Sequence, residues 1–232
     1  MSVIKAVVFD LGGVLSDSSP RYLYRKLLKS EAEIDEFLST VCTPAWNHQQ
    51  DLGRSWKEGT DELIEKFPDK KDLILAYWHR WEDTINGPFH QSVDILMDLK
   101  RRGIPLYLLS NYSPENFPKA LELFPFLRLF DGRIVSGFVK LAKPDPAIYH
   151  LLLNTYHLNP RETLFIDDKR ENVQAAWDVG MNAVQFLSPA QLEQDLIEYG
   201  LITGPDLEAD HSHHCGSDAD HSHSCCGGGK CH

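Results

Sequence analysis

Cysteine is scarce in most of the chain, and long apolar runs are absent. Of the 5 cysteines, only Cys42 precedes residue 211, so the body of the chain offers no disulfide framework and suits a reducing compartment. No run reaches the roughly 18 apolar residues of a membrane-spanning helix, and residues 1–10 lack the pattern of a secretory signal. We therefore expect a cytoplasmic protein with no membrane partner.

Positive charge is also in short supply. The sequence holds 23 Lys and Arg against 34 Asp and Glu, a formal net charge of -11. Surfaces that bind nucleic acid are normally basic, so this balance argues against a nucleic-acid partner. The 232 residues, 42% of them apolar, are enough for one globular domain with a sizeable insertion. The oligomeric state is left open.

Apolar runs alternate with helical periodicity along the chain. Strands are predicted at 3–9, 104–109, 133–135, 163–166 and 182–186, with helices at 91–102, 146–157 and 171–179. Such alternation implies right-handed crossovers and a parallel sheet covered on both faces. Between residues 20 and 84, apolar residues recur at spacings of three and four, which predicts a helical block. We predict an α/β fold with a Rossmann-like core (1–16 and 88–202) and a small helical cap (17–87).

Polar side chains stand where the apolar strands end. Asp10 ends the first strand, Ser110-Asn111 the second, and Asp167-Asp168 a later one. One such carboxylate can equally cap the next helix, but in an open α/β sheet the carboxyl ends of the strands are where ligands bind. Lys143 lies just before a predicted helix that starts at Pro146. From its local sequence alone, Lys143 is expected to be a solvated surface residue.

These residue types suit phosphoryl chemistry. Three carboxylates in one place repel each other unless a divalent cation lies among them, and oxygen ligands favour Mg²⁺. A carboxylate beside that cation can attack phosphorus and form an aspartyl phosphate. A lysine would neutralise charge on the transferring group, while a serine hydroxyl and loop amides bind its oxygens.

Four ordered motifs resemble those of the haloacid dehalogenase-like (HAD) hydrolase superfamily. They are Val7–Leu15, Leu108–Asn111, Lys143–Tyr149 and Leu164–Asp168. The helical insertion resembles that superfamily's type 1 cap, and the motif text is most similar to the sugar-phosphatase group that includes bacterial glucose-1-phosphatase. The resemblance covers roughly residues 3–200.

The resemblance implies a magnesium-dependent phosphomonoester hydrolase that acts on a small phosphorylated metabolite, such as a sugar phosphate. It implies these roles: Asp10 as nucleophile and metal ligand, Lys143 as the catalytic lysine, Ser110 and Asn111 as substrate-binding residues, and Asp167 with Asp168 as metal ligands.

Gly12 departs from the family pattern. Most phosphatases of the superfamily carry a second Asp here, which protonates the leaving oxygen and then activates water, and its loss typically costs about 10² to 10⁴ in rate. Gly12 can still offer its carbonyl to the metal. Asp17, or the cap residues His48 and Asp51, are candidates to supply the proton instead.

Two other functions stay open at this point. A 2-haloacid dehalogenase would use the same Asp nucleophile on carbon without a metal, although the family's dehalogenases carry Tyr where this chain has Gly12. A binding or scaffold protein with little turnover is the third interpretation, and the intact Asp10, Lys143 and Asp167 argue against it.

Residues 46–51 interrupt the helical periodicity of the cap. They place one large aromatic, Trp46, among polar side chains that include His48, a composition suited to stacking on and hydrogen bonding a sugar. We therefore take Trp46 and His48 as candidate substrate-binding residues. The alternative is a loop between cap helices, with Trp46 packed in the cap core.

The C-terminal segment, 203–232, has no apolar periodicity and is predicted to be a disordered tail. Residues 209–213 recur as 219–223. Its imidazoles and thiols suit Zn²⁺, Ni²⁺ or copper, although their spacing is not that of a folded zinc module. The candidate tail ligands are His211, His213, His214, Cys215, His221, His223, Cys225, Cys226, Cys231 and His232. Metal sequestration by this tail is an alternative function.

Overall fold

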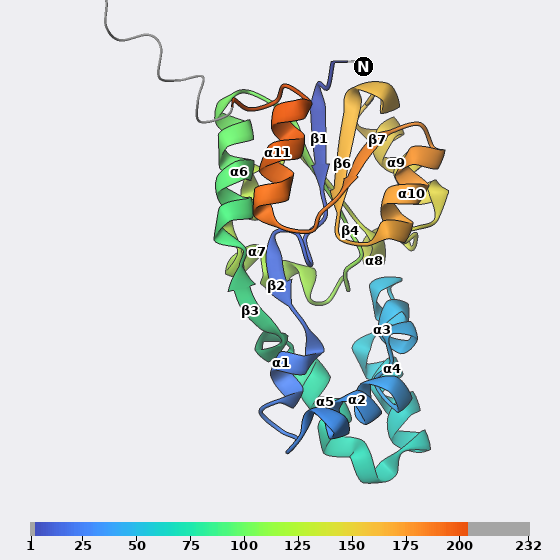
Figure 1. Cartoon of the computed structure of the whole chain (residues 1–232). Helices are drawn as coiled ribbons and strands as arrows, with labels where there is room; N and C mark the ends of the chain where they lie inside the picture. Colours follow the sequence, from blue (N-terminus) through green and yellow to red (C-terminus); the bar gives the residue numbers. More distant parts are fainter. Residues whose placement is uncertain (1–2, 204–232) are drawn as a thin grey trace, which may run out of the picture. The chain divides into compact units, whose positions relative to one another are not determined.

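A parallel sheet with the order β5-β4-β1-β6-β7 forms the middle layer of the α/β core (Figure 1). The computed structural model describes residues 3–203. The strands are β1 (Ala6–Phe9), β4 (Leu106–Ser110), β5 (Gly132–Val135), β6 (Thr163–Asp167) and β7 (Asn182–Gln185). All neighbouring strands in this sheet pair in parallel, which confirms the predicted fold class.

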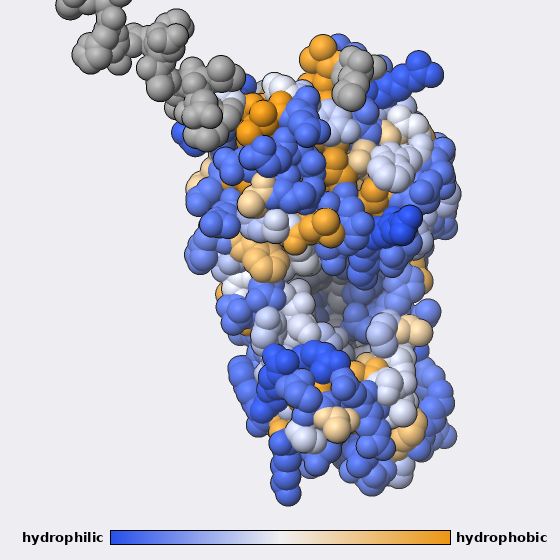
Figure 2. All heavy atoms as spheres, viewed as in Figure 1, coloured by the Kyte–Doolittle hydropathy of each residue, from blue (hydrophilic) through white to orange (hydrophobic). Residues whose placement is uncertain are grey.

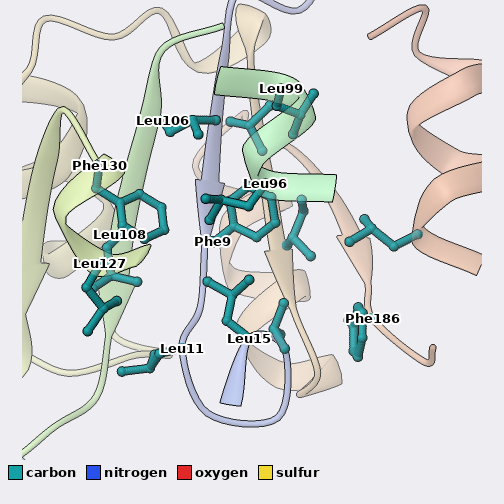
Figure 3. Packing of buried hydrophobic residues seen from close by; sticks show 14 of the residues in the cluster. Phe9, Leu11, Leu15, Leu96, Leu99, Leu106, Leu108, Leu127, Phe130 and Phe186 are labelled. Atoms are coloured by element: carbon teal, nitrogen blue, oxygen red, sulfur yellow. The ribbon is translucent and has the colours of Figure 1, made fainter. Parts of the chain in front are cut away.

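Helices cover both faces of the sheet, which is why its strands read as continuous apolar runs. One layer holds α6 (His90–Arg101), α7 (Phe117–Leu123) and α11 (Pro189–Glu198), and the other holds α9 (Pro146–Thr155) and α10 (Arg170–Asp178). Successive residues of β1 serve opposite layers: Val7 and Phe9 pack in the first and Val8 in the second. Figure 3 shows Phe9 among leucines of the first layer. A short helix, α8 (Ser136–Val139), follows β5.

An antiparallel ribbon joins this core to the helical insertion. It consists of β2 (Ser16–Ser18) and β3 (Ile85–Pro88), with Ser16 paired to Pro88 (Figure 1). The ribbon was not expected from the sequence, and neither were α7 and α11. The predicted core–cap boundaries, 16/17 and 87/88, fall within it.

The insertion forms a cap with its own hydrophobic core. Its helices are α1 (Pro20–Tyr24), α2 (Glu31–Thr40), α3 (Pro44–Asp51), α4 (Trp56–Lys66) and α5 (Lys71–His79). Short 3₁₀ turns lie at Pro68–Lys70, Trp81–Thr84, Pro125–Leu129 and Pro160–Glu162. Side chains of Ser30, Thr43 and Ser55 cap the starts of α2, α3 and α4.

The structure corrects the interpretation of residues 46–51. They do not interrupt a helix but lie within α3, and Trp46 is 7% exposed. Its ring packs 5.7 Å from that of Trp56, and its Nε1 donates to the Gly59 carbonyl at 3.0 Å. Trp46 therefore belongs to the cap core, the alternative left open above.

Two further expectations concern the C-terminal tail and membrane-spanning helices. The candidate tail ligands, from His211 to His232, lie outside the described residues. Within residues 3–203, no helix is long and apolar enough to span a membrane.

Replacing Trp46 by Ala tests its packing role. Because the substitution removes a buried aromatic side chain and its hydrogen bond, we expect the free energy of unfolding in urea to fall by about 3–5 kcal/mol. The control is Gln49→Ala, an exposed position on the same helix, for which we expect a change within about 0.5 kcal/mol. Equal stabilities for the two variants would contradict this placement of Trp46.

Candidate active site

Three carboxylates meet at the carboxyl ends of two neighbouring strands. Asp10 directly follows the central strand β1, and its N–H donates to the Ile166 carbonyl of β6 at 2.9 Å. Asp167 ends β6 and Asp168 comes next. Each of the three offers an oxygen within 4.8 Å of the others. The strand ends that the sequence singles out thus form one cluster.

Lys143 lies inside this cluster. Its side chain is buried, with Nζ 2.9 Å from Asp10 Oδ1 and 2.6 Å from Asp167 Oδ2. Burial by itself lowers the pKa of Lys143, but the Asp10 and Asp167 carboxylates raise it above its ordinary value. The ammonium therefore stays charged, and Lys143 is not the solvated surface residue that its local sequence suggests.

Asp10 is held in one orientation. Its Oδ1 accepts the Leu11 N–H at 2.7 Å in addition to Lys143. Burial raises the pKa of Asp10 to about 7; the Lys143 ammonium lowers it, and the Asp167 charge adds to the rise. The carboxylate is thus destabilised unless further positive charge is supplied.

Asn111 binds the backbone of the lysine loop. Its Oδ1 accepts the Lys143 N–H at 2.9 Å, and its Nδ2 donates to the Lys143 carbonyl at 2.8 Å. The side chain therefore positions Lys143, a role that the sequence did not indicate. Ser110 is buried, and its Oγ has no hydrogen-bond partner among the described residues.

The carboxylate oxygens of the cluster differ in the number of hydrogen bonds that they accept. Asp167 Oδ1 accepts the Lys169 N–H and Asn172 Nδ2, both at 2.9 Å. Asp168 Oδ1, by contrast, is buried without a partner in the described part of the chain. A buried acceptor normally has a partner, so an orphaned carboxylate oxygen beside two further carboxylates fits a hard cation such as Mg²⁺.

Asn172 is a site residue that the sequence reasoning missed. Its side chain is buried and orients Asp167 from the first turn of α10. A signal was available, because Asn172 is a polar residue on the otherwise apolar buried face of that predicted helix.

Two glycines line the site, and the geometry requires glycine at only one of the two positions. Gly13 has φ +79°, and a β-carbon there would lie 2.6 Å from Asp168 Oδ2, so only glycine fits. A β-carbon at Gly12 would meet only Ser18 Oγ, at 3.6 Å. A β-carbon is therefore accommodated at position 12.

A cavity of about 800 Å³ extends from this cluster to the cap. Figure 2 shows the surface hollowed in this region. On the core side it is lined by Asp10, Gly12, Asn111, Lys143 and Asp168, and on the cap side by Asn47, His48 and Asp51 among others. His48 thus lines the cavity, whereas Trp46 does not.

The three candidates for the missing proton donor have different surroundings. Asp17 accepts hydrogen bonds from Tyr22 Oη of α1 and Asn86 Nδ2 of β3, and does not line the cavity. His48 and Asp51 do line it. Asp51 is half-buried; burial raises its pKa to about 7, against the opposing Lys169 charge.

Comparison with known proteins identifies the family. A model of the haloacid dehalogenase-like hydrolases matches residues 4–180. The chain belongs to this family and is a hydrolase, which confirms the resemblance carried by its four motifs.

Individual relatives match over most of their length. A sesquiterpene phosphatase of Aspergillus oryzae is 26% identical, covering 78% of this chain and 88% of the relative. A D-ribitol-5-phosphate phosphatase of Bacteroides thetaiotaomicron is 25% identical and covers 84% and 97%, respectively. The magnesium complex of a HAD family enzyme from Bacteroides thetaiotaomicron is 25% identical with a TM-score of 0.62, covering 80% of this chain and 94% of that one.

The raised pKa of Asp51 gives a pH-dependent prediction. An unfolded Asp ionises near pH 4, so between about pH 4 and 7 the unfolded chain releases a proton that the folded chain keeps. This group therefore lowers the stability of the wild type as pH rises through that window. The amide introduced by Asp51→Asn cannot ionise, so we expect the variant to gain about 2 kcal/mol on the wild type between about pH 5 and 8.

The measurement is urea denaturation of both proteins across this pH range. The Lys169 ammonium and the phenols of Tyr77 and Tyr112 face Asp51, and burial raises the pKa of both phenols. Taking the difference between the two proteins removes titrations common to both. A difference that does not change with pH would show that Asp51 is solvated as in the unfolded chain.

Proposed function

We propose that the protein is a magnesium-dependent phosphomonoester hydrolase that works through an aspartyl-phosphate intermediate on a small phosphorylated metabolite, such as a sugar phosphate. The observation that carries this proposal is the buried cluster of Asp10, Asp167 and Asp168 around Lys143, with Asp168 Oδ1 left without a partner among the described residues. One lysine leaves this cluster with an excess of negative charge, which suits a divalent cation.

The donor set fits Mg²⁺. Asp10, Asp167 and Asp168, with the Gly12 carbonyl, are the oxygen ligands, and the bound ion would neutralise charge on the phosphoryl group and on the carboxylates around it. Magnesium in the structure of a relative supports this choice of metal.

Different residues of the chain have different roles in this reaction. The Asp10 carboxylate, oriented by Leu11 N–H and Lys143, attacks phosphorus, and the bond from phosphorus to the ester oxygen breaks. Lys143 offsets negative charge beside the nucleophile, and the Ser110 hydroxyl, unpartnered within the described range, is available to a phosphoryl oxygen. Water then hydrolyses the aspartyl phosphate and restores Asp10.

Relatives and cavity chemistry support the substrate class. Both curated relatives described above are named phosphatases, one of a phosphorylated polyol and one of a sesquiterpene. Asn47, His48 and Asp51 line the cap side of the cavity and offer hydrogen bonds to a hydroxylated leaving group. Leu38, Trp56 and Tyr77 line the same cavity, so it also offers apolar contacts to the carbon skeleton of a substrate.

The dehalogenase alternative is less well supported. Attack of the same carboxylate on carbon requires no metal, and it leaves no role for a third carboxylate with a buried oxygen that lacks a partner in residues 3–203.

The free, buried Cys42 agrees with the cytoplasmic location inferred from cysteine usage.

Asp10→Asn and metal removal test the proposal together. With a panel of sugar phosphates, we expect the wild type to release phosphate with Mg²⁺, to stop on addition of chelator, and to recover with excess Mg²⁺. We expect Asp10→Asn to lose at least about 10³-fold in kcat, because asparagine is not a nucleophile. Halide release from a 2-haloacid that chelator leaves unchanged would instead favour a dehalogenase.

We also propose that the C-terminal tail chelates Zn²⁺ or Ni²⁺, on the ground of its ten His and Cys ligands and their repeat. Deleting residues 206–232 is expected to abolish tight zinc and nickel binding in calorimetry and to leave magnesium-dependent turnover unchanged, since the described site uses none of these residues. Loss of turnover on deletion would contradict this division of roles.

A further inference from the structure

Gly12 leaves the proposed reaction without a proton donor on the strand that carries the nucleophile. An alcohol is a poor leaving group as its anion, so an alkyl phosphate requires a proton from another residue at the ester oxygen. The donor has to face the cavity near Asp10 and must not already be committed to an ion pair.

Two carboxyl groups of the cap line the cavity, and only one of them lacks an ion pair in the described part of the chain. Asp35 is exposed and pairs with Arg21. Asp51 is half-buried and forms no ion pair within 4 Å in the described range 3–203. It accepts a hydrogen bond from Asn47 Nδ2 at 3.2 Å.

Asp51 and the nucleophile line the same cavity, together with residues that follow the strands on either side of β1. Ser113 lies three residues beyond the end of β4, Lys169 lies two residues beyond the end of β6, and both line this cavity. Strand β1 lies between β4 and β6, and Asp10 is the residue at its end. Asp51 therefore opens onto the cavity into which Asp10 also opens.

The end of α3 is fastened to the core, so this position does not depend on a mobile cap loop. Ser136 Oγ donates to the Asp51 carbonyl. Trp56 Nε1 donates to Ser113 Oγ at 3.1 Å, and its backbone N–H donates to Glu115 Oε1 at 2.9 Å. Gly53 lies so close to the Gly137 carbonyl that a β-carbon would approach it to 2.8 Å.

We propose that Asp51 of the cap is the general acid and base that replaces the carboxyl missing at Gly12; this inference rests on the proposed function. As the Asp10–phosphorus bond forms and the ester bond breaks, the Asp51 proton passes to the departing oxygen and gives the alcohol. The Asp51 carboxylate then takes a proton from the water that attacks the aspartyl phosphate. That step releases phosphate and Asp10 and returns Asp51 to its protonated form.

The raised pKa of Asp51 supports this assignment, because a carboxyl with a pKa of about 7 is partly protonated at neutral pH. His48 lines the same cavity, but it is the backbone of Asp51 that is bonded to the core, through Ser136 Oγ.

The test compares two leaving groups with Asp51→Asn. One substrate is the sugar phosphate that the wild type hydrolyses best, and the other is p-nitrophenyl phosphate, whose phenolate departs without a proton. The quantity is kcat/KM, which reports the steps up to the aspartyl phosphate. We expect a fall of about 10² to 10⁴ for the sugar phosphate and less than about tenfold for the nitrophenyl ester.

Two further variants make the comparison decisive. Gln49→Ala, on the same helix but outside the cavity lining, is the control and should leave both values unchanged. Gly12→Asp in the Asp51→Asn background restores a carboxyl beside Asp10 where space exists, and should recover at least about tenfold for the sugar phosphate alone. Denaturation in urea checks that each variant is folded.

Each outcome has a meaning. Equal losses for both substrates, or no loss for either, would overturn the assignment of Asp51 while leaving the proposed function intact. A folded wild type that hydrolyses neither substrate with Mg²⁺ would overturn the proposed function, and with it this inference.

Discussion

The site depends on the burial of more negative than positive charge at the end of β1. Asp10 and Asp167 both contact the Lys143 ammonium, and Asp168 lies within reach of the same point. Removing carboxylates from water costs free energy that a single lysine does not offset for all three. A second cation would complete the charge balance, and in the proposed reaction it would lie beside the carboxylate that attacks phosphorus.

The fold supplies this arrangement through strand order and a few side-chain bonds. Because β1 lies between β4 and β6, their ends deliver Asp10, Ser110 and Asp167 to one place. Asn111 binds both polar groups of the Lys143 backbone, and Asn172 orients Asp167. The cap lines the other side of the cavity, and the backbone of Asp51 is bonded to Ser136 of the core. The groups proposed to be catalytic thus come from strand ends, a helix end and short segments bonded to them.

Much of this arrangement was predictable from sequence, for a physical reason. Strands buried on both faces read as apolar runs, and a carboxylate at the end of such a run is visible in one sequence. The convergence of Asp10 with Asp167 then follows from parallel topology. The burial of Lys143 does not, because it depends on two carboxylates far away along the chain, and the local pattern around it suits a surface.

Other features escaped sequence reasoning because they are not local. The ribbon of β2 and β3 is only a few residues long and contains polar residues, Gly and Pro, so it shows no alternation. Trp46 looked like a ligand-binding aromatic because its polar neighbours are adjacent in sequence, whereas the rings that bury it, Trp56 and Tyr77, come from other helices. Thr43 and Pro44 at the start of α3 were usable signals for that helix.

The central claim is that the Asp10 carboxylate becomes phosphorylated beside a divalent cation. The direct measurement is rapid quenching of the enzyme during turnover of a phosphate ester, borohydride reduction of the acyl phosphate, and peptide mass spectrometry. The account predicts that position 10 alone is converted to homoserine, and only when Mg²⁺ is present. Turnover with Asp10 unmodified at every quench time, or conversion of another residue, would contradict it.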